Sequence, residues 1–469
     1  MSQMLIVFTA GCLALLMGCV TVLLDSPKQD QGTNPPSSTG STAMISATED
    51  PPPDGSANSA GAAAVLLAGP TEDPLEPRRD HPIDNPPLDP FIEKALEWLI
   101  SAQHESGGWG AGSHSAQQIL DPHKIQTDPA TTAFTAMALL RIGGDPTKGK
   151  YKGPLRKACQ YLVRVVTQSD IAGPSITTLQ GTQPQSKLGR FIDTSMTLQF
   201  LSKVLTKLPD TDPLHDSVDQ ALDKCLSKVQ ESQQQDGSWE GGSWAGVLQS
   251  SVGCSSLEWA AIAGKEIDKV ALVRAREHQK GNFNTTTGRA SAPDSAGVEL
   301  YAFAGSQRAA ASEAGAAQQI IDLAKIDGVL EEGALCSLEN LITAGIEAGK
   351  AKVLFDAYSQ IDTQFNMLEN EQLLSGFGNN GGEEFLSYML TSEAVVLQGG
   401  NAWRVWEEKM ITRMSKIQLA DGSWTGHHCI TSTVFCTAAV IQCLTADRDL
   451  ELLKVLTDRD VKSNSTQGR

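Results

Sequence analysis

The stretch KALEWLISAQHESGGW (94–109) joins a helix-like run to a glutamine, a glycine and a tryptophan. The same ending, Gln-x3-Gly-x-Trp, returns in QQQDGSW (233–239) and in QLADGSW (418–424). Recurrence of one local pattern at three places indicates a repeat architecture built from similar supersecondary units.

Two kinds of helical segment alternate around these copies. Amphipathic segments cover 89–103, 154–168, 216–233, 266–279, 313–325, 350–366 and 401–418. Segments with few charges cover 129–143, 193–205, 246–264, 294–307, 334–347, 384–397 and 430–445. A helix with a polar face belongs outside and an apolar one inside. We therefore predict an all-α fold of six or seven helical hairpins that close into an αα-toroid around a central cavity. An open solenoid is the alternative.

The three copies resemble the QW motif of squalene–hopene cyclases and related triterpene cyclases. The first copy meets every element of that motif through Lys94, Ala95, Trp98, Leu99, Gln103, Gly107 and Trp109. The second keeps Gln233, Gly237 and Trp239, and the third keeps Lys409, Gln418, Gly422 and Trp424. The resemblance spans about 88–447 and implies the αα-toroid that terpenoid cyclases share with protein prenyltransferase β-subunits. We interpret the motif as a fastening between hairpins: the glycine permits a tight turn and the tryptophan buries a large area.

The first 24 residues form a separate segment. Met4 to Leu24 carries no charge and is long enough for a membrane span or a secretion signal. Within it, Leu16-Met17-Gly18-Cys19 resembles a bacterial lipoprotein box, in which Cys19 would be lipidated. Residues 25–87 are rich in Pro, Ser, Thr and Gly and are predicted to be a disordered linker. Residues 448–469 are predicted to be a C-terminal tail. The main domain is thus expected in the cell envelope, outside the cytoplasm and tethered to the membrane through the N-terminus.

Charge and missing motifs exclude several function classes. A formal net charge of −18 disfavours nucleic acid as a partner. Cyclases that protonate an alkene carry Asp-x-Asp-Asp, and ionising terpene synthases carry Asp-Asp-x-x-Asp, but the chain contains no Asp-Asp dipeptide. The zinc ligands of prenyltransferases lack a convincing counterpart, because Val252 precedes Cys254 where that family has an aspartate. We expect no metal and no cofactor.

The densest chemical cluster is His427, His428 and Cys429, at the start of the last apolar helix. A His-Cys pair is suited to metal binding or nucleophilic chemistry, but loop histidines that cap or solvate a helix end are the favoured interpretation. Asp193 and Asp128 open apolar helices and suit helix capping or, as a pair of carboxylates, glycan cleavage. The pairs Glu331-Glu332 and Glu383-Glu384 are interpreted as solvated loop or first-turn residues.

Three functions stay open, and whether the chain is an enzyme is not decided. The first is a binding module for an apolar small molecule, a peptide or an envelope protein. The second is an isoprenoid-acting enzyme with an atypical acid site, which rests on analogy with the family. The third is a glycan-acting (α/α) barrel enzyme.

Overall fold

The computed structural model describes residues 87–239, 242–378, 380–399 and 401–465. The predicted anchor segment 1–24 with Cys19, and all but the last residue of the predicted linker 25–87, lie outside these residues. Within them the fold is all-α, as predicted. No described helix is both long and apolar enough to span a membrane.

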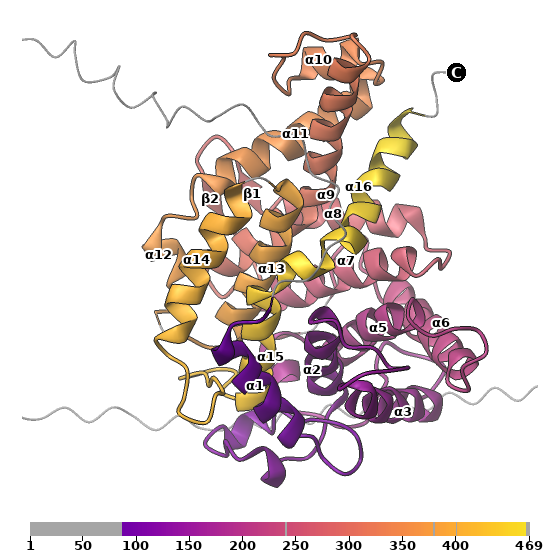
Figure 1. Cartoon of the computed structure of the whole chain (residues 1–469), viewed down its shortest axis with the longest axis vertical. Coiled ribbons are helices and arrows are strands. Elements are labelled where there is room, and N and C mark those ends of the chain that lie inside the picture. Colours follow the sequence, from indigo (N-terminus) through magenta and orange to yellow (C-terminus); the bar gives the residue numbers. More distant parts are fainter. Residues whose placement is uncertain (1–86, 240–241, 379, 400, 466–469) are drawn as a thin grey trace, which may run out of the picture. The chain divides into compact units, whose positions relative to one another are not determined.

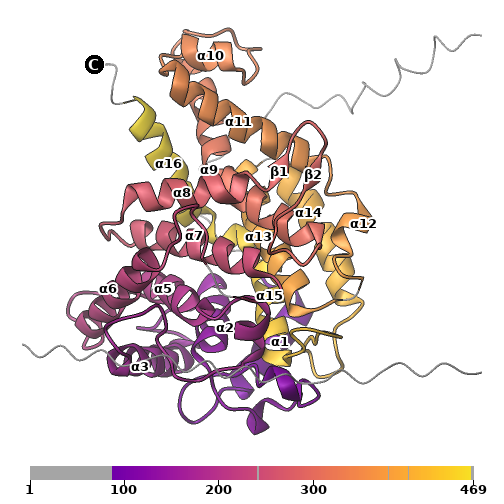
Figure 2. The ribbon, with the colours of Figure 1, turned by 180° about the vertical axis from the view of Figure 1, so that it is seen from behind.

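Within the described residues, six helices contact one another as an inner layer and six pack outside them as an outer layer; Figures 1 and 2 show the ribbon from two sides. The inner ones are α2 (Pro129–Arg141), α5 (Ile192–Leu205), α7 (Gly246–Ile262), α9 (Glu299–Ile326), α13 (Gly382–Gln398) and α15 (Thr433–Leu444). The outer ones are α1 (Pro90–Ser101), α3 (Lys152–Gln168), α6 (His215–Glu231), α8 (Lys269–Lys280), α11 (Ala348–Phe365) and α14 (Asn401–Ser415). Every residue of α2 is buried, which is why its sequence shows no polar face.

The inner helices contact one another in a closed cycle. Each packs on the next in the order α2, α5, α7, α9, α13 and α15, and α15 packs back on α2. The first and last inner helices are therefore neighbours, as in a toroid of six hairpins, and no inner helix at either end of the series is left without a neighbour.

Short elements connect and cover these layers. They are η1 (His114–Ala116), η2 (Pro122–Lys124), α4 (Gln183–Lys187), β1 (Phe283–Asn284), β2 (Arg289–Ala290), α10 (Leu338–Thr343), α12 (Glu371–Leu374), η3 (Ala446–Asp449) and α16 (Leu450–Ser465). The segment 448–469 is predicted to be a C-terminal tail, but much of it forms helix α16. Helix α16 packs on α9, and Leu453 is fully buried.

Of the six or seven hairpins that the sequence left open, the described residues form six. The expected helices 294–307 and 313–325 form one continuous helix, α9, of 28 residues, because the alanine-rich stretch between them contains no helix breaker. The expected inner helix 334–347 is mostly loop, with the six-residue α10 at its centre. Glu339 and Ile342 of α10 are exposed, so this segment is not part of the inner layer.

The three motif copies make the same contacts. The indole N–H donates to the carbonyl oxygen ten residues earlier at 2.8, 2.8 and 2.9 Å for Trp109, Trp239 and Trp424. The backbone N–H of each tryptophan is held at 2.9–3.0 Å by a hydroxyl of an inner helix, from Thr132, Ser250 and Thr437 respectively. Each tryptophan thus ties the end of an outer helix to an inner one.

The glutamines link one outer helix to the next. Nε2 of Gln103, Gln233 and Gln418 donates to the motif glycine's carbonyl and to a carbonyl in the first turn of the following outer helix, at Pro154, Ala271 and Phe91. The Gln418–Phe91 bond of 2.9 Å joins the end of α14 to the start of α1. Lys94 reinforces this junction by donating to the carbonyl of Ala420 at 2.7 Å.

Alternating charges fill one end of the space between the inner helices. Each residue of the following series forms an ion pair with the next one: Lys203, Asp449, Arg141, Glu393, Arg308, Glu258 and Arg276. Burial would raise the pKa of Asp449, but the charges of Lys203 and Arg141 outweigh burial and hold it at about 2. Buried charges are tolerated only when they are paired in this way. We refer to this series as the charge network.

The pocket that the described residues form between the inner helices is much smaller than the predicted central cavity. The pocket between the inner helices, lined by Phe134, Met196, Gln199, Val252, Ser255, Leu386, Met389, Leu390 and Glu393, has a volume of about 10 Å³. This volume holds about one water molecule. Large side chains occupy the space in which the helix pattern predicts a cavity. Among them are Phe134 and Phe435, whose rings stack with their centroids 4.6 Å apart.

Candidate functional site

Loops from five parts of the chain meet over the N-terminal ends of the inner helices. We call them the loop cap: residues 111–117, 181–189, 242–245, 376–382 (without 379) and 425–432. Backbone hydrogen bonds join them, including Gln183 N to Gly112 O at 2.9 Å, Ala245 N to Lys187 O at 2.7 Å and Gly382 N to Ile430 O at 3.0 Å. The cap therefore brings together side chains that are distant in sequence.

Glu383 is the buried acid beside this cap. The residue has no exposed surface, and its Oε2 accepts from the N–H of Ile430 at 3.2 Å. Burial and the neighbouring Glu384 raise the pKa of Glu383 to about 8. At neutral pH this side chain is thus mainly a neutral carboxylic acid, able to donate a proton or a hydrogen bond.

Cys429 lies beside this acid, and His428 precedes this cysteine in the chain. The Cys429 thiol interacts with the carboxyl group of Glu383, and burial together with Glu383 raises the pKa of the thiol to about 12. A thiol held neutral in this way is a poor nucleophile. Cys429 also adopts a left-handed backbone, with φ of 61°. Both ring nitrogens of His428 are buried and have no hydrogen-bond partner among the described residues. The ring packs edge-on against Phe377, with the two ring centroids 5.2 Å apart.

An aromatic row leads from His428 to a lysine. The ring centroids of Phe377 and Trp244 lie 5.6 Å apart, and Nζ of Lys187 lies 5.1 Å from the Trp244 ring centroid. Lys187 also acts electrostatically on Glu383 and Cys429. The cap thus combines a protonated acid, a thiol, an imidazole and a cation.

Asp193 belongs to a second acidic pair. Burial and Asp193 raise the pKa of Asp128 to about 7, and burial raises that of Asp193 to about 6. All four carboxyl oxygens accept hydrogen bonds: those of Asp128 from Thr131 N and Ala111 N, those of Asp193 from Ala130 N and Gln185 Nε2. The pair fastens α2 and α5 and leaves no oxygen free.

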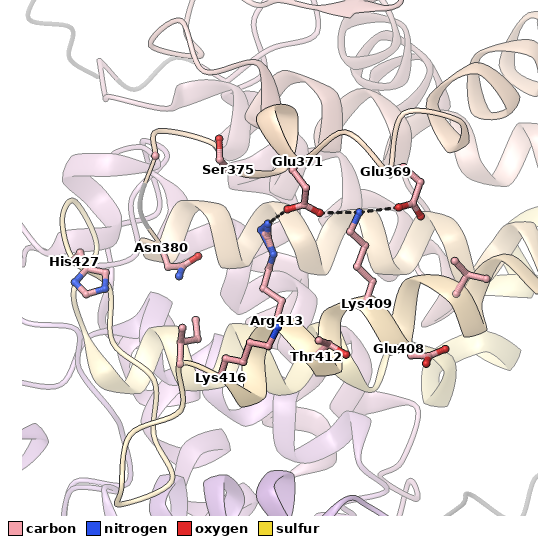
Figure 3. A pocket seen from close by; sticks show the side chains of 13 residues that line it. Glu369, Glu371, Ser375, Asn380, Glu408, Lys409, Thr412, Arg413, Lys416 and His427 are labelled. Atoms are coloured by element: carbon pink, nitrogen blue, oxygen red, sulfur yellow. Dashed lines mark hydrogen bonds and ion pairs between the residues drawn. The ribbon is translucent and has the colours of Figure 1, made fainter.

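The structure separates His427 from the other members of the predicted cluster. His427 is exposed and lines a groove between α12 and α14, with a volume of about 870 Å³ (Figure 3). We call it the α12–α14 groove. Its lining residues are Glu369, Glu371, Ser375, Gly378, Asn380, Val405, Glu408, Lys409, Thr412, Arg413, Lys416, Ile417 and His427.

Charges inside the groove are partly paired. Glu371 binds Lys409 at 3.0 Å and Arg413 at 2.5 Å, and Glu369 binds Lys409 at 3.3 Å (Figure 3). Lys416 is exposed and forms no ion pair with the part of the chain that the structure describes. Asn380 and His427 lie toward the other end of the groove from Glu369.

Sequence reasoning missed Glu383. Glu383 and Glu384 lie in the first turn of α13, one of the two positions expected, but neither side chain is exposed. Glu384 accepts from the Tyr301 hydroxyl at 2.8 Å. The available signal was their position at the start of a largely uncharged inner helix. The other pair, Glu331-Glu332, is exposed as predicted. Cys429 lies in the loop before α15, whereas Cys436 and Cys443 are buried within that helix.

Comparison with known proteins agrees with the motif. Residues 81–171 match the squalene-hopene cyclase C-terminal domain family. A protein named probable squalene–hopene cyclase from Sinorhizobium fredii (strain NBRC 101917 / NGR234) is 36% identical over 84 residues, which are 18% of this chain and 12% of that protein. The chain therefore matches only a small part of that relative's length. The family match over residues 81–171 and this relative support a likeness to the terpenoid cyclase-like superfamily, in agreement with the all-α fold and the three motif copies.

Proposed function

We propose that this protein is a binding module in which the cyclase-like ring serves as a scaffold, and that it binds a peptide segment of a partner protein in the α12–α14 groove. The observation that carries this proposal is the contrast between the two pockets. The interior pocket holds about 10 Å³, whereas the groove holds about 870 Å³. Ligand sites commonly measure about 300–1,000 Å³, so of these two pockets the groove is the one that is large enough.

The lining of the groove favours a peptide over an apolar small molecule. Ser375, Asn380 and Thr412 offer hydrogen-bonding groups suited to a peptide backbone. Lys416 is a cation without an ion pair in the described structure, and it would pair with an acidic side chain of the peptide. An isoprenoid would leave these polar groups without partners, which costs binding free energy.

Selection from a displayed library of 12-residue peptides tests the proposal. Enriched peptides should bind the purified chain, and Lys416→Glu should weaken them at least tenfold because it reverses the unpaired charge. Lys150→Glu is the matched control, since Lys150 is exposed and lies outside the groove. No enrichment, or equal binding by the Lys416→Glu and wild-type proteins, would refute the assignment.

An isoprenoid-acting enzyme is the second candidate, and Glu383 is the observation that favours it. A buried carboxyl with its proton retained is the kind of group that general-acid catalysis uses. Incubation with squalene and with prenyl diphosphates should then give a product that the Glu383→Gln variant does not form. Absence of product from the wild-type chain with and without added divalent metals would end this candidate. The glycan-acting candidate gains no such support, because the oxygens of Asp128 and Asp193 are all engaged.

We also propose that the N-terminal segment tethers the domain to the membrane of the cell envelope. The support is the uncharged run Met4–Leu24 and the lipoprotein-like box at Cys19. Expression of the full chain in a bacterial host followed by membrane fractionation tests it. If Cys19 is lipidated, Cys19→Ser should lose the mass of the acyl chains. Full recovery of the wild-type chain in the soluble cytoplasmic fraction would contradict tethering.

A further inference from the structure

The longest helix of the ring carries an arm that the other hairpins lack. Helix α9 has 28 residues, whereas the other inner helices have 12 to 17. At 1.5 Å per residue, the excess of at least 11 residues extends α9 by about 16 Å. We define the arm as residues 316–356, which comprise the end of α9, the following loop, α10 and the first half of α11; α10 lies at its tip (Figures 1 and 2).

The arm is a folded element with its own small core. This core is a separate cluster of buried residues: Ala316, Ala317, Ile320, Ile321, Cys336, Leu341, Ile346, Ala351 and Leu354. Helix α16 supports it, because Lys350 Nζ donates to the carbonyl of Ser463 at 2.9 Å. The outer surface of the arm is therefore held in a defined conformation.

Large apolar side chains nevertheless remain exposed on this arm. Ile326 and Leu335 are each 80% exposed, Val329 is 53% exposed, and Leu323 and Ile342 are each 45% exposed. Leu323 and Ile326 are three residues apart on α9 and so share one face. Single exposed apolar residues are normal, but a concentration within 20 residues is typical of an interaction surface.

Acidic residues accompany these apolar ones. Between 322 and 342 there are five exposed acids, Asp322, Asp327, Glu331, Glu332 and Glu339. Lys325 is the single basic residue of this stretch, so its net charge is −5 + 1 = −4. Lys325 is also paired with Asp322 at 3.6 Å.

We propose that the arm tip is a docking surface for an amphipathic helix of a partner protein, one with an apolar face flanked by lysine or arginine. The apolar face would cover Ile326 and Leu335, and the basic flanks would pair with the acids around them. A second copy of this chain fits less well because it would set −4 against −4. The arm shares no residue with the α12–α14 groove, so the two surfaces are tested by different variants.

A synthetic peptide provides the probe. An 18-residue helix with leucines on one face and lysines beside them, carrying a fluorophore, is titrated with the full chain and followed by anisotropy. We expect saturable binding that weakens as salt is raised, because exposed charges are screened. Two control peptides should bind at least tenfold more weakly: one of the same composition with the leucines scattered, and one with glutamate in place of lysine.

Variants assign the binding to the arm. The double variant Ile326→Ser, Leu335→Ser and the double variant Glu331→Lys, Glu332→Lys should each weaken binding at least tenfold. Ile171→Ser with Val270→Ser is the matched control, since these residues are 89% and 66% exposed outside the arm, and it should leave binding unchanged. All of the substituted side chains are exposed, so circular dichroism should confirm an unchanged fold.

Three outcomes would overturn the inference. The first is equal binding of the three peptides, and the second is equal binding by the arm variants and the wild-type chain. The third comes from sedimentation: a wild-type dimer that Ile326→Ser, Leu335→Ser converts to a monomer would identify a second copy as the occupant.

Discussion

Glu393 is the residue whose removal tests the charge network most directly. Its carboxylate lies between two buried guanidinium groups, accepting from Nη2 of Arg141 and from Nε of Arg308 at 2.7 Å. The substitution Glu393→Gln keeps the size of the side chain but removes its negative charge. The variant would therefore remove one of the anions that neutralise the two buried guanidinium groups.

The expected loss is about 3–5 kcal/mol in the free energy of unfolding, the range for breaking a buried ion pair by removing one partner. The side chains of Arg141 and Arg308 are 1% and 2% exposed, so water cannot replace the lost carboxylate. Each retains one other anion, Asp449 at 2.8 Å and Glu258 at 2.9 Å, which favours the lower end of that range. The charges of Arg141 and Arg308 outweigh burial and hold the pKa of Glu393 below its usual value, so the wild-type carboxylate is ionised at pH 7.

Urea unfolding at pH 7, followed by far-ultraviolet circular dichroism, measures the change. Glu371→Gln is the matched control, because Glu371 also bridges two cations but its side chain is 64% exposed. Exposed ion pairs contribute about 0–1 kcal/mol, so this control should shift the unfolding midpoint little. A loss below about 1 kcal/mol for Glu393→Gln, equal to that of the control, would refute the argument that buried pairing holds the centre of the ring together.

Three further predictions concern the acid and the motif. In the folded protein the pKa of Glu383 is about 8, against 4.5 for the free side chain. Between these two pH values the folded state keeps a proton that the unfolded state loses. The free energy of unfolding should therefore fall as the pH rises from about 4.5 to 8. In urea titrations, Glu383→Gln should flatten this decline, matching the wild-type protein at pH 4 and exceeding it at pH 9; an unchanged decline would contradict the assignment. Trp424→Ala should cost about 3–5 kcal/mol by thermal or urea unfolding, because the indole is fully buried and donates to Met414 O at 2.9 Å. Gly422→Ala should cost roughly 1–3 kcal/mol, since Gly422 has φ of 100° and an added Cβ would lie 2.7 Å from Cγ of Lys94. Gly153→Ala in α3, where a Cβ meets nothing within 4 Å, is its control and should stabilise the protein by about 0.5 kcal/mol.

The sequence by itself determined the helical repeat. Apolar and amphipathic segments alternate with helical periodicity, and periodicity reports which faces are buried. The Gln-x3-Gly-x-Trp copies predicted the junctions because their contacts are mostly local: each tryptophan bonds ten residues back, and each glutamine bonds its own motif glycine. The position of Glu383 at the opening of an inner helix was also visible, but nothing local distinguishes a buried carboxyl from a solvated one.

Only the tertiary structure decided what fills the ring and which surfaces stay open. The partners of Arg141 in the charge network, Glu393 and Asp449, lie 252 and 308 residues away. A lone charge on an apolar helix does not reveal which distant residue will pair with it. The sequence therefore predicted a large central cavity, whereas the pocket between the inner helices holds about one water molecule. Helical periodicity likewise predicted a break between 307 and 313, whereas packing of α9 against α11, α13 and α16 favours one long helix. Local pattern identifies a buried face, but the neighbour that buries it is chosen by contacts across the whole chain.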